Sequence, residues 1–403
     1  MSLDSSSSPS AQISPVAGPE VRADGDDLRQ TSLINLSWTK QSINLILVGE
    51  TGVGKTAMVN LLANVCAGIS LEKFDDKVDL SNELGGKEAA GSQTIAPKFY
   101  SIICANGQRV NILDTPGFAD ERGIEFDRVH KQALVQAMKE QIDSIDAIVV
   151  LLHGDSARLD TRTEYALATI FSVLDTSLPD NIVFIFTNVS SPPGFNFPIS
   201  SLPNWLQSTP RWSIDNPCIR WFAYRKALSQ PSGTVDEDSL EDMNDVAHRG
   251  YHAGLKMLSQ FFQHLDKCQP KPIQGILQLY ELSMYIETHV SNIIARSELL
   301  AIKRATNVGK EIEKLEQEID ASLTEVVDAC ERYNKLSLAG SFVRLLYCTI
   351  HMLQYRDAST RKLQELAHGV TDSEVLDRLA RSIGRIQKEV KVLEEVDHRN
   401  EKA

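Results

Sequence analysis

Cysteine is scarce in this sequence and never clustered. Six cysteines are spread over 403 residues, with no CxxC pair and no cysteine–histidine group at metal-ligand spacing. This distribution indicates neither a disulfide framework nor a zinc site. A reducing, cytoplasmic compartment is therefore expected, and attachment at the periphery of a membrane is compatible with it.

The chain also lacks a surplus of positive charge. It has 41 Lys and Arg against 54 Asp and Glu, a formal net charge of -13, and no basic cluster stands out. Binding along a nucleic acid needs such a surplus, because cationic side chains neutralise the phosphates. We therefore expect no nucleic-acid partner, and simple adhesion to anionic lipid is equally disfavoured.

Long apolar runs are missing as well. The serine- and proline-rich start has no basic segment followed by an apolar one, so it is unlike a secretory signal, and residues 1–38 are expected to form a disordered tail. The most apolar late segment, residues 338–355, is interrupted by Arg344 and His351. We expect no transmembrane segment, and a buried or membrane-surface helix fits this stretch better.

What the first two thirds of the chain do contain is an alternation of apolar patterns. Strand-like runs lie at residues 43–48, 99–104, 110–113, 147–152 and 182–187, with helix-like segments between most of them. This alternation predicts an α/β fold, a doubly wound and mostly parallel sheet with helices on both faces. A last strand is expected at residues 219–223, and Thr234 with Glu237 has the spacing of a capping box that begins a long helix.

Proline disappears after Pro272, and helix formers dominate from there onward. We place a boundary here, between a G domain at residues 39–268 and an all-helical, partly coiled-coil region at 269–403. Two apolar runs repeat at spacings of three and four, the pattern of a coiled coil. Pairing within one chain and pairing between chains both stay open, and a helical protein partner is a further expectation. The runs are Val308, Ile312, Leu315 and Ile319, and Leu376, Leu379, Ile383, Ile386, Val390 and Leu393.

The segment GETGVGKT, residues 49–56, matches the pattern G-x-x-x-x-G-K-[ST] and lies between a predicted strand and a predicted helix. In such a loop, backbone N–H groups and the helix N-terminus bind phosphate oxygens. Lys55 is expected to contact the β and γ phosphates, and Thr56 to offer its hydroxyl to Mg²⁺. The candidate nucleotide contacts are Gly49, Glu50, Thr51, Gly52, Val53, Gly54, Lys55, Thr56 and Ala57.

A second motif, RVNILDTPGFAD, ends an apolar strand further along the chain. Asp114 is placed to hold Mg²⁺ through water, and the backbone N–H of Gly117 to meet a γ phosphate. The polar stretch between the two motifs suits a loop that becomes ordered around the phosphate and the metal. Within it, Thr94 is the candidate sensor and metal ligand, with Ser92 as the competing hydroxyl.

Together with SQT before a strand and ARLDTRTEYAL further on, these motifs resemble the septin-like GTPases of the P-loop TRAFAC class, especially the immune-associated nucleotide-binding (IMAP-type) GTPases. The similarity covers residues 43–188. It implies a G domain that binds GTP or GDP with Mg²⁺, with Thr94 in its first switch and Asp114 and Gly117 in its second. It also implies a nucleotide-dependent homodimer through this domain. In some members of the family an arginine at the place of Arg158 reaches across the dimer toward the phosphates, and the alternative for Arg158 is a solvated surface charge.

The stretch FIFTNVSSPPGF departs from the family. Where the family has an aspartate that accepts two hydrogen bonds from guanine, this chain has Ser190. Thr187 and Asn188 remain as candidate contacts for the base. Guanine is expected from the resemblance, and adenine is the alternative that the missing carboxylate leaves open.

Catalysis is weakly marked, because Phe118 stands where Ras-like enzymes orient the attacking water with a glutamine. The first hypothesis is therefore a slow GTPase, with Lys55, Thr94 and Arg158 as catalytic groups and hydrolysis completed across a dimer. The second is a nucleotide-gated scaffold that scarcely hydrolyses GTP. An ATPase is a minor third alternative.

Overall fold

The computed structural model describes residues 36, 38–75, 96–118, 124–230, 234–305, 309–338, 340, 342–366 and 373–400. Almost all of the expected disordered tail lies outside these residues, as do Thr94 and Ser92. Leu36 and Trp38, at the end of that tail, are described and buried. The Trp38 ring stacks on Phe262 with 4.4 Å between ring centroids.

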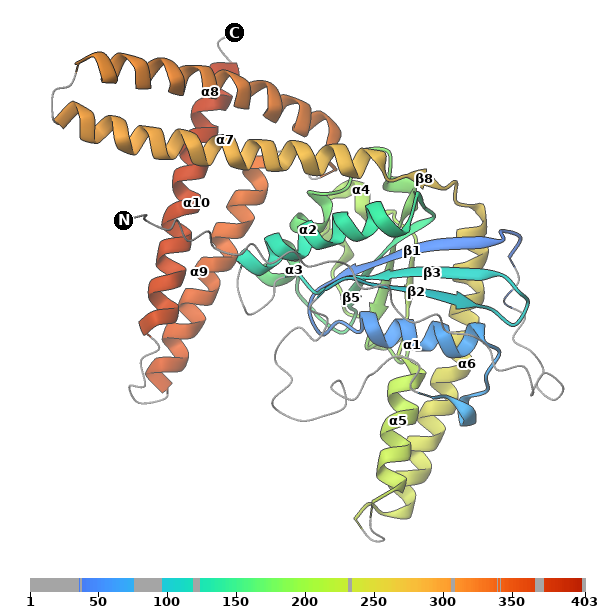
Figure 1. Cartoon of the computed structure of the whole chain (residues 1–403). Helices are drawn as coiled ribbons and strands as arrows, with labels where there is room; N and C mark the ends of the chain where they lie inside the picture. The colour runs from blue at the N-terminus through green and yellow to red at the C-terminus, as the bar shows by residue number, and fades with distance from the viewer. Residues whose placement is uncertain are drawn as a thin grey trace, which may run out of the picture.

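A six-stranded sheet forms the centre of the first part of the chain (Figure 1). Its order is β2-β3-β1-β5-β6-β7, and every neighbouring pair is parallel except the antiparallel hairpin β2–β3. The central strands β1, β5 and β6 are buried along nearly their whole length, as expected for parallel strands covered on both faces. The strands are β1 (Ser42–Gly49), β2 (Lys98–Ile103), β3 (Arg109–Asp114), β5 (Ala147–His153), β6 (Ile182–Thr187) and β7 (Arg211–Ser213).

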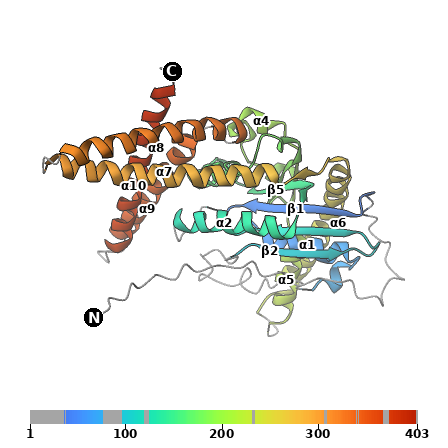
Figure 2. The ribbon, with the colours of Figure 1, turned by 45° about the horizontal axis from the view of Figure 1, so that its top comes forward.

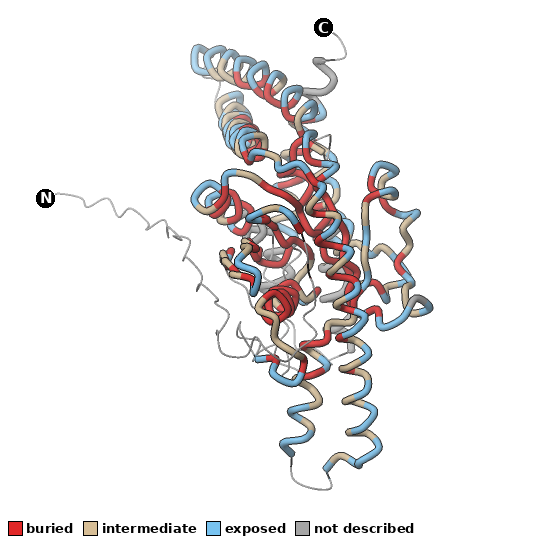
Figure 3. Tube along the Cα trace, turned by 90° about the vertical axis from the view of Figure 1, so that its right-hand side faces the viewer, coloured by how far each residue is buried: buried red, intermediate tan, exposed pale blue. Residues whose placement is uncertain are grey.

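Helices cover both faces of this sheet, and alternate residues of each strand point to opposite sides. In β1, Leu45 and Leu47 belong to one apolar cluster with α1 (Lys55–Cys66), α5 (Pro217–Leu228) and α6 (Glu237–Lys267). Ile46 and Val48 belong to the other, with α2 (Ile124–Gln141) and α3 (Thr161–Phe171). The predicted fold class, a doubly wound α/β G domain followed by helices, is confirmed. The distal turns of α5 and α6 extend beyond the sheet and are mostly exposed (Figure 3).

After the two-residue strand β8 (Lys271–Pro272), which pairs with β4 (Ser144–Ile145), four long helices make up the rest of the described chain. Helices α7 and α8 pack side by side as one hairpin, and α9 and α10 form a second hairpin that crosses it (Figures 1 and 2). The predicted heptad runs lie on α8, apart from Val308, which is outside the described residues, and on α10. Within this chain α8 packs on α7 and α10 packs on α9. The bounds are α7 (Gln274–Ala305), α8 (Gly309–Leu336), α9 (Phe342–Leu366) and α10 (Ser373–Asn400).

The helical region shares a core with one face of the sheet. Buried residues of α2 and α3 belong to the same apolar cluster as buried residues of all four long helices. Helix α3 packs along α9. Just after the end of α3, the Ser172 carbonyl accepts a hydrogen bond from the hydroxyl of Tyr333 on α8 at 2.9 Å. Two main-chain hydrogen bonds also connect the segment after α3 to the end of α8. The Thr176 N–H donates to the Leu336 carbonyl, and the Leu338 N–H donates to the Leu174 carbonyl.

Two local predictions were wrong. Residues 219–223, expected as a strand, lie within helix α5, which begins with Pro217 and is capped by Asn216. A short apolar run does not distinguish a strand from a buried helix. Here Asn216 and Pro217 favour the helix, because asparagine is a good helix cap and proline is well tolerated at the first helical position. Helix α6 is capped by Asp236, whose carboxylate accepts from the Ser239 N–H at 2.8 Å, and not by Thr234.

Candidate functional site

The phosphate-binding loop predicted from GETGVGKT lies between the end of β1 and the start of α1. Gly54, the residue that precedes α1, has φ 97°, a left-handed conformation that favours glycine. The Lys55 side chain is buried and folds back over the loop, where Nζ donates to the carbonyls of Gly49 at 3.2 Å and Glu50 at 2.8 Å. The loop thus surrounds a fixed ammonium group at a helix N-terminus, a suitable place for phosphate.

Asp114 lies beside this loop at the carboxyl end of β3. Thr56 donates its hydroxyl to Asp114 Oδ2 at 2.9 Å, and the carboxyl group is fully buried. Burial raises the pKa of Asp114 to about 6, although Lys55, the Thr56 hydrogen bond and Lys98 act in the opposite direction. Asp114 Oδ1 is buried and accepts no hydrogen bond from a described residue. This unpartnered carboxylate oxygen and the nearby Thr56 hydroxyl are the kind of oxygen ligands that Mg²⁺ prefers.

The segment after Asp114 packs directly on the phosphate-binding loop. The Thr51 N–H donates to the Phe118 carbonyl at 3.4 Å, and the Phe118 N–H donates to the Gly49 carbonyl at 3.2 Å. A Cβ added to Gly117 would lie 2.4 Å from Thr51 Cα, so the close approach requires glycine. The Phe118 side chain is only 1% exposed, and such a packed ring cannot orient water. The structure therefore brings the two sequence motifs together.

The residues expected to meet the base lie at the end of β6. A Cβ on Gly54 would be 3.9 Å from the Thr187 methyl carbon, so this strand ends beside the phosphate-binding loop. Asn188 has a left-handed backbone, φ 60°, and its Nδ2 lies 3.2 Å from His153 Nδ1. Ser190 is exposed and supplies no carboxylate.

Sequence reasoning missed the loop after β7, which reaches the same end of the sheet. Asn216 donates from Nδ2 to the Ala57 carbonyl in α1 at 2.9 Å, and its Oδ1 caps α5. The neighbouring Asp215 is paired with Arg220 at 3.0 Å. The Asn-Pro pair at the start of a helix was the available signal for the cap, whereas the contact with α1 joins residues 159 positions apart.

The loop between β5 and α3 carries Arg158. Its side chain is exposed, and its carbonyl accepts a hydrogen bond from the Ser156 hydroxyl at 3.1 Å. Helix α3 follows, capped by Asp160, which accepts from the Thr163 N–H at 2.8 Å. Glu50, predicted as a nucleotide contact, accepts from Lys55 at its backbone carbonyl, and burial raises the pKa of its carboxyl group.

Of the remaining candidates, Val53 and Ala57 are buried in the core, so their side chains are not available to a ligand. Thr94, predicted as sensor and metal ligand, lies outside the described residues.

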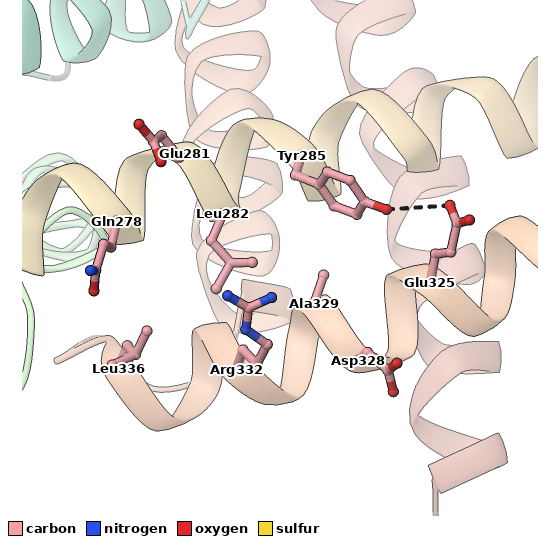
Figure 4. A pocket seen from close by; sticks show the side chains of 9 residues that line it. All are labelled: Gln278, Glu281, Leu282, Tyr285, Glu325, Asp328, Ala329, Arg332 and Leu336. Atoms are coloured by element: carbon pink, nitrogen blue, oxygen red, sulfur yellow. Dashed lines mark hydrogen bonds between the residues drawn. The ribbon is translucent and has the colours of Figure 1, made fainter.

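A groove elsewhere in the molecule is lined only by α7 and α8 (Figure 4). Leu282 and Ala329 form part of its apolar wall, Tyr285 donates to Glu325 at 3.3 Å, and Arg332 extends between the two helices. It is separate from the phosphate-binding loop. No helix among the described residues offers an apolar stretch long enough to cross a bilayer.

Comparison with known proteins supports the class defined by this geometry, a P-loop G domain. Residues 43–197 match the model of the AIG1 family. Immune-associated nucleotide-binding protein 7 of Arabidopsis thaliana is 26% identical over 149 residues, which cover 37% of this chain and 42% of that protein. Immune-associated nucleotide-binding protein 12 of the same organism is 22% identical over 290 residues, 71% of this chain and 66% of that protein. The resemblance predicted from the motifs is thus confirmed for the G domain, while the chain spans less than half of the first relative.

Among solved structures, Toc33 from Arabidopsis thaliana in complex with Mg²⁺ and GMPPNP aligns with a TM-score of 0.33 and 15% identity. The alignment covers 57% of this chain and 87% of that one. A likeness at this level supports no inference about the site.

Proposed function

We propose that this protein binds GTP with Mg²⁺ through its G domain and acts as a nucleotide-dependent switch that dimerises and hydrolyses GTP slowly. The observation that carries the proposal is the convergence of Lys55, the Thr56–Asp114 pair and Gly117 around one phosphate-binding loop. The family match of residues 43–197 supports the same conclusion.

Each group has a defined task in this proposal. Lys55 neutralises phosphate charge, and the loop N–H groups bind the phosphate oxygens. Thr56 and Asp114 would hold Mg²⁺, which supplies positive charge against the phosphates when bound. In hydrolysis, water attacks the γ phosphorus, the bond to the β–γ bridging oxygen breaks, and GDP, phosphate and a proton are released. The exposed Arg158 is available to stabilise the developing charge in a partner subunit.

Size-exclusion chromatography with light scattering tests the switch. The full chain is loaded in turn with GDP, GMPPNP and an ATP analogue, and Lys55→Ala is compared with Lys256→Ala, an exposed lysine on α6. We expect dimers with GMPPNP alone, lost in Lys55→Ala and kept in Lys256→Ala. Dimers with the ATP analogue would refute the assignment of guanine as the base. An unchanged mass in all nucleotide states would refute nucleotide-dependent dimerisation.

The role of Arg158 is tested by kinetics. Turnover per subunit is expected to rise with protein concentration, and Arg158→Ala to reduce the dimer rate about tenfold or more. A rate that is independent of concentration while dimers are present would exclude an arginine acting across the dimer.

The packed Phe118 favours a second candidate function, a nucleotide-gated scaffold with negligible hydrolysis, in which the long helices bind a helical protein partner. This alternative predicts nucleotide-dependent oligomers that retain intact GTP for hours. Measuring phosphate release from the purified dimer separates it from a slow GTPase.

A further inference from the structure

The carboxyl ends of three neighbouring strands, β1, β5 and β6, lie next to one another. Gly49 of β1 pairs with Leu151 of β5, and two residues further along β5, His153 pairs with Thr187 of β6. His153 therefore ends the strand that lies between the phosphate-binding loop and Asn188, the residue after β6. In an open parallel sheet, ligands bind in the crevice outside such carboxyl ends, so His153 and Asn188 lie where a nucleotide would extend from the loop.

The backbone at Asn188 is fixed by its neighbours on both sides. The Thr187 carbonyl accepts from the Gly154 N–H at 2.9 Å, and the Val189 N–H donates to the Ile214 carbonyl at 3.3 Å. A Cβ added to Gly154 would lie 2.3 Å from Val189 Cγ2, so this close approach requires glycine. Asn188, with φ 60°, is the only residue other than glycine with a left-handed backbone among those that the structure describes. Such a conformation in an exposed turn is typical of a functional position.

One end of the Asn188 carboxamide is held by His153. Asn188 Nδ2 lies 3.2 Å from His153 Nδ1. A neutral imidazole with its proton on Nε2 accepts at Nδ1, and the amide nitrogen is then the donor. The other end of the carboxamide, Oδ1, accepts no hydrogen bond from a described residue, and the side chain is exposed. The contact therefore leaves an oriented acceptor at this end of the sheet.

An acceptor is the group that the site otherwise lacks for a purine. Guanine presents the donors N1–H and N2–H₂ on one edge, and adenine presents N6–H₂. Ser190, in the place of the aspartate that would accept from guanine, is exposed and has no carboxylate. An amide oxygen can accept in its place, but a freely rotating carboxamide presents its NH₂ group as readily as its oxygen. Recognition of a donor therefore needs a second residue that fixes the orientation of the amide.

We propose that His153 is a positioning residue for the base, which orients the Asn188 carboxamide so that Oδ1 accepts a hydrogen bond from an N–H group of the purine. The inference rests on the proposed function, because it needs a nucleotide at the phosphate-binding loop. His153 itself does not contact the base. Its effect is confined to nucleotides whose base carries an N–H donor.

Competition binding of the full chain with Mg²⁺ measures this effect, with a GTP analogue labelled on the ribose as the fluorescent reporter. The two competitors are GTP and purine riboside triphosphate, which keeps the purine ring, the ribose and the phosphates but has no N–H group on the base. Wild type is expected to bind GTP more than about tenfold tighter than purine riboside triphosphate. The ratio of the two affinities is independent of effects on the phosphate-binding loop, because both competitors carry the same phosphates.

The variants separate orientation from support of the fold. His153→Phe keeps a planar ring without the acceptor and is expected to lower the ratio about fivefold, with an unchanged affinity for purine riboside triphosphate. His153→Asn returns an acceptor oxygen to the place of Nδ1 and is expected to keep the wild-type ratio within about twofold. His351→Phe makes the aromatic change at an exposed histidine of α9 and serves as the matched control.

A double substitution tests whether His153 acts through Asn188. Asn188→Ala is expected to lower the ratio at least as much as His153→Phe. Adding His153→Phe to Asn188→Ala is expected to change the ratio by less than about twofold, because the amide that the histidine orients is already absent.

Four results would overturn the positioning role. They are a wild-type ratio in His153→Phe, an equal loss of affinity for both competitors in that variant, the same fall in His153→Asn as in His153→Phe, and a further fivefold fall when His153→Phe is added to Asn188→Ala. Failure of the wild-type chain to bind either competitor, with Lys55→Ala as the negative control, refutes the proposed function itself. Binding of GTP with a ratio near one in wild type refutes the role of the Asn188 acceptor alone.

Discussion

Replacing Gly117 by alanine tests whether the close contact between the two motifs is a real constraint. The added Cβ would lie 2.3 Å from Thr51 Oγ1, 2.4 Å from Thr51 Cα and 2.5 Å from Thr51 N. Rotating the threonine side chain relieves only the first of these contacts, because the other two involve backbone atoms. The phosphate-binding loop and the segment after Asp114 must therefore move apart.

The energetic cost follows from what this movement disrupts. Overpacking of this kind costs about 1–3 kcal/mol. The hydrogen bonds Thr51 to Phe118 and Phe118 to Gly49 are weakened too, each worth about 1 kcal/mol. We expect Gly117→Ala to lower the free energy of unfolding by about 2–4 kcal/mol without nucleotide, and to weaken GTP binding as well.

Urea unfolding followed by tryptophan fluorescence measures the change, with Gly384→Ala as the matched control. Nothing lies within 4 Å of a Cβ at Gly384, which is inside helix α10. The same substitution is therefore expected to stabilise the protein there by up to about 1 kcal/mol. A loss below about 1 kcal/mol in Gly117→Ala, or an equal loss in Gly384→Ala, would refute the steric reasoning.

Three further substitutions have defined outcomes. Burial raises the pKa of Tyr333 from 10.0 to about 12, so its contribution to stability is present below pH 10 and lost as the pH rises through about 12. Tyr333→Phe should flatten this alkaline loss in unfolding experiments and cost about 1 kcal/mol at pH 7, where it removes the hydrogen bond to Ser172. Asn216→Ala should cost about 1–2 kcal/mol in urea unfolding, since it removes a helix cap and the bond to Ala57; a neutral effect would contradict both contacts. Ser190→Asp should raise the preference for GTP over ATP about tenfold in competition binding, and an unchanged ratio would show that position 190 does not face the base.

The strands and the phosphate-binding loop were accessible from sequence because their signals are local. Residues 43–48 are continuously apolar and end in the glycine-rich loop, so strand, turn and helix are specified within about 20 positions. The pairing of Thr56 with Asp114 could be anticipated from the order of the two motifs alone. The contact of the Asn216 side chain with the Ala57 backbone carbonyl could not, because it joins residues 159 positions apart whose proximity only the folded sheet creates.

In the helical region, too, the sequence predicts local structure but not the contacts between distant segments. Heptad spacing predicted the helix over residues 376–393, and Ile386, Val390 and Leu393 are indeed buried. Spacing specifies which face of a helix is apolar but not what covers it, and here α7 and α9 of the same chain contact α10. The strand expected at residues 219–223 failed for a related reason, since five apolar-rich residues carry too little periodicity to exclude a helix.

The apolar cluster shared by the sheet and the four long helices has a consequence for how this protein can be divided. A fragment ending at Cys268 would expose the side of α3 that contains Leu167 and Phe171, which faces Leu345 and Cys348 of α9 in the whole chain. Such a fragment is expected to aggregate, and heating the intact chain should produce one cooperative transition instead of two. Any relative that keeps the G domain without these helices must carry polar residues on this side of α3 or cover it with a different segment.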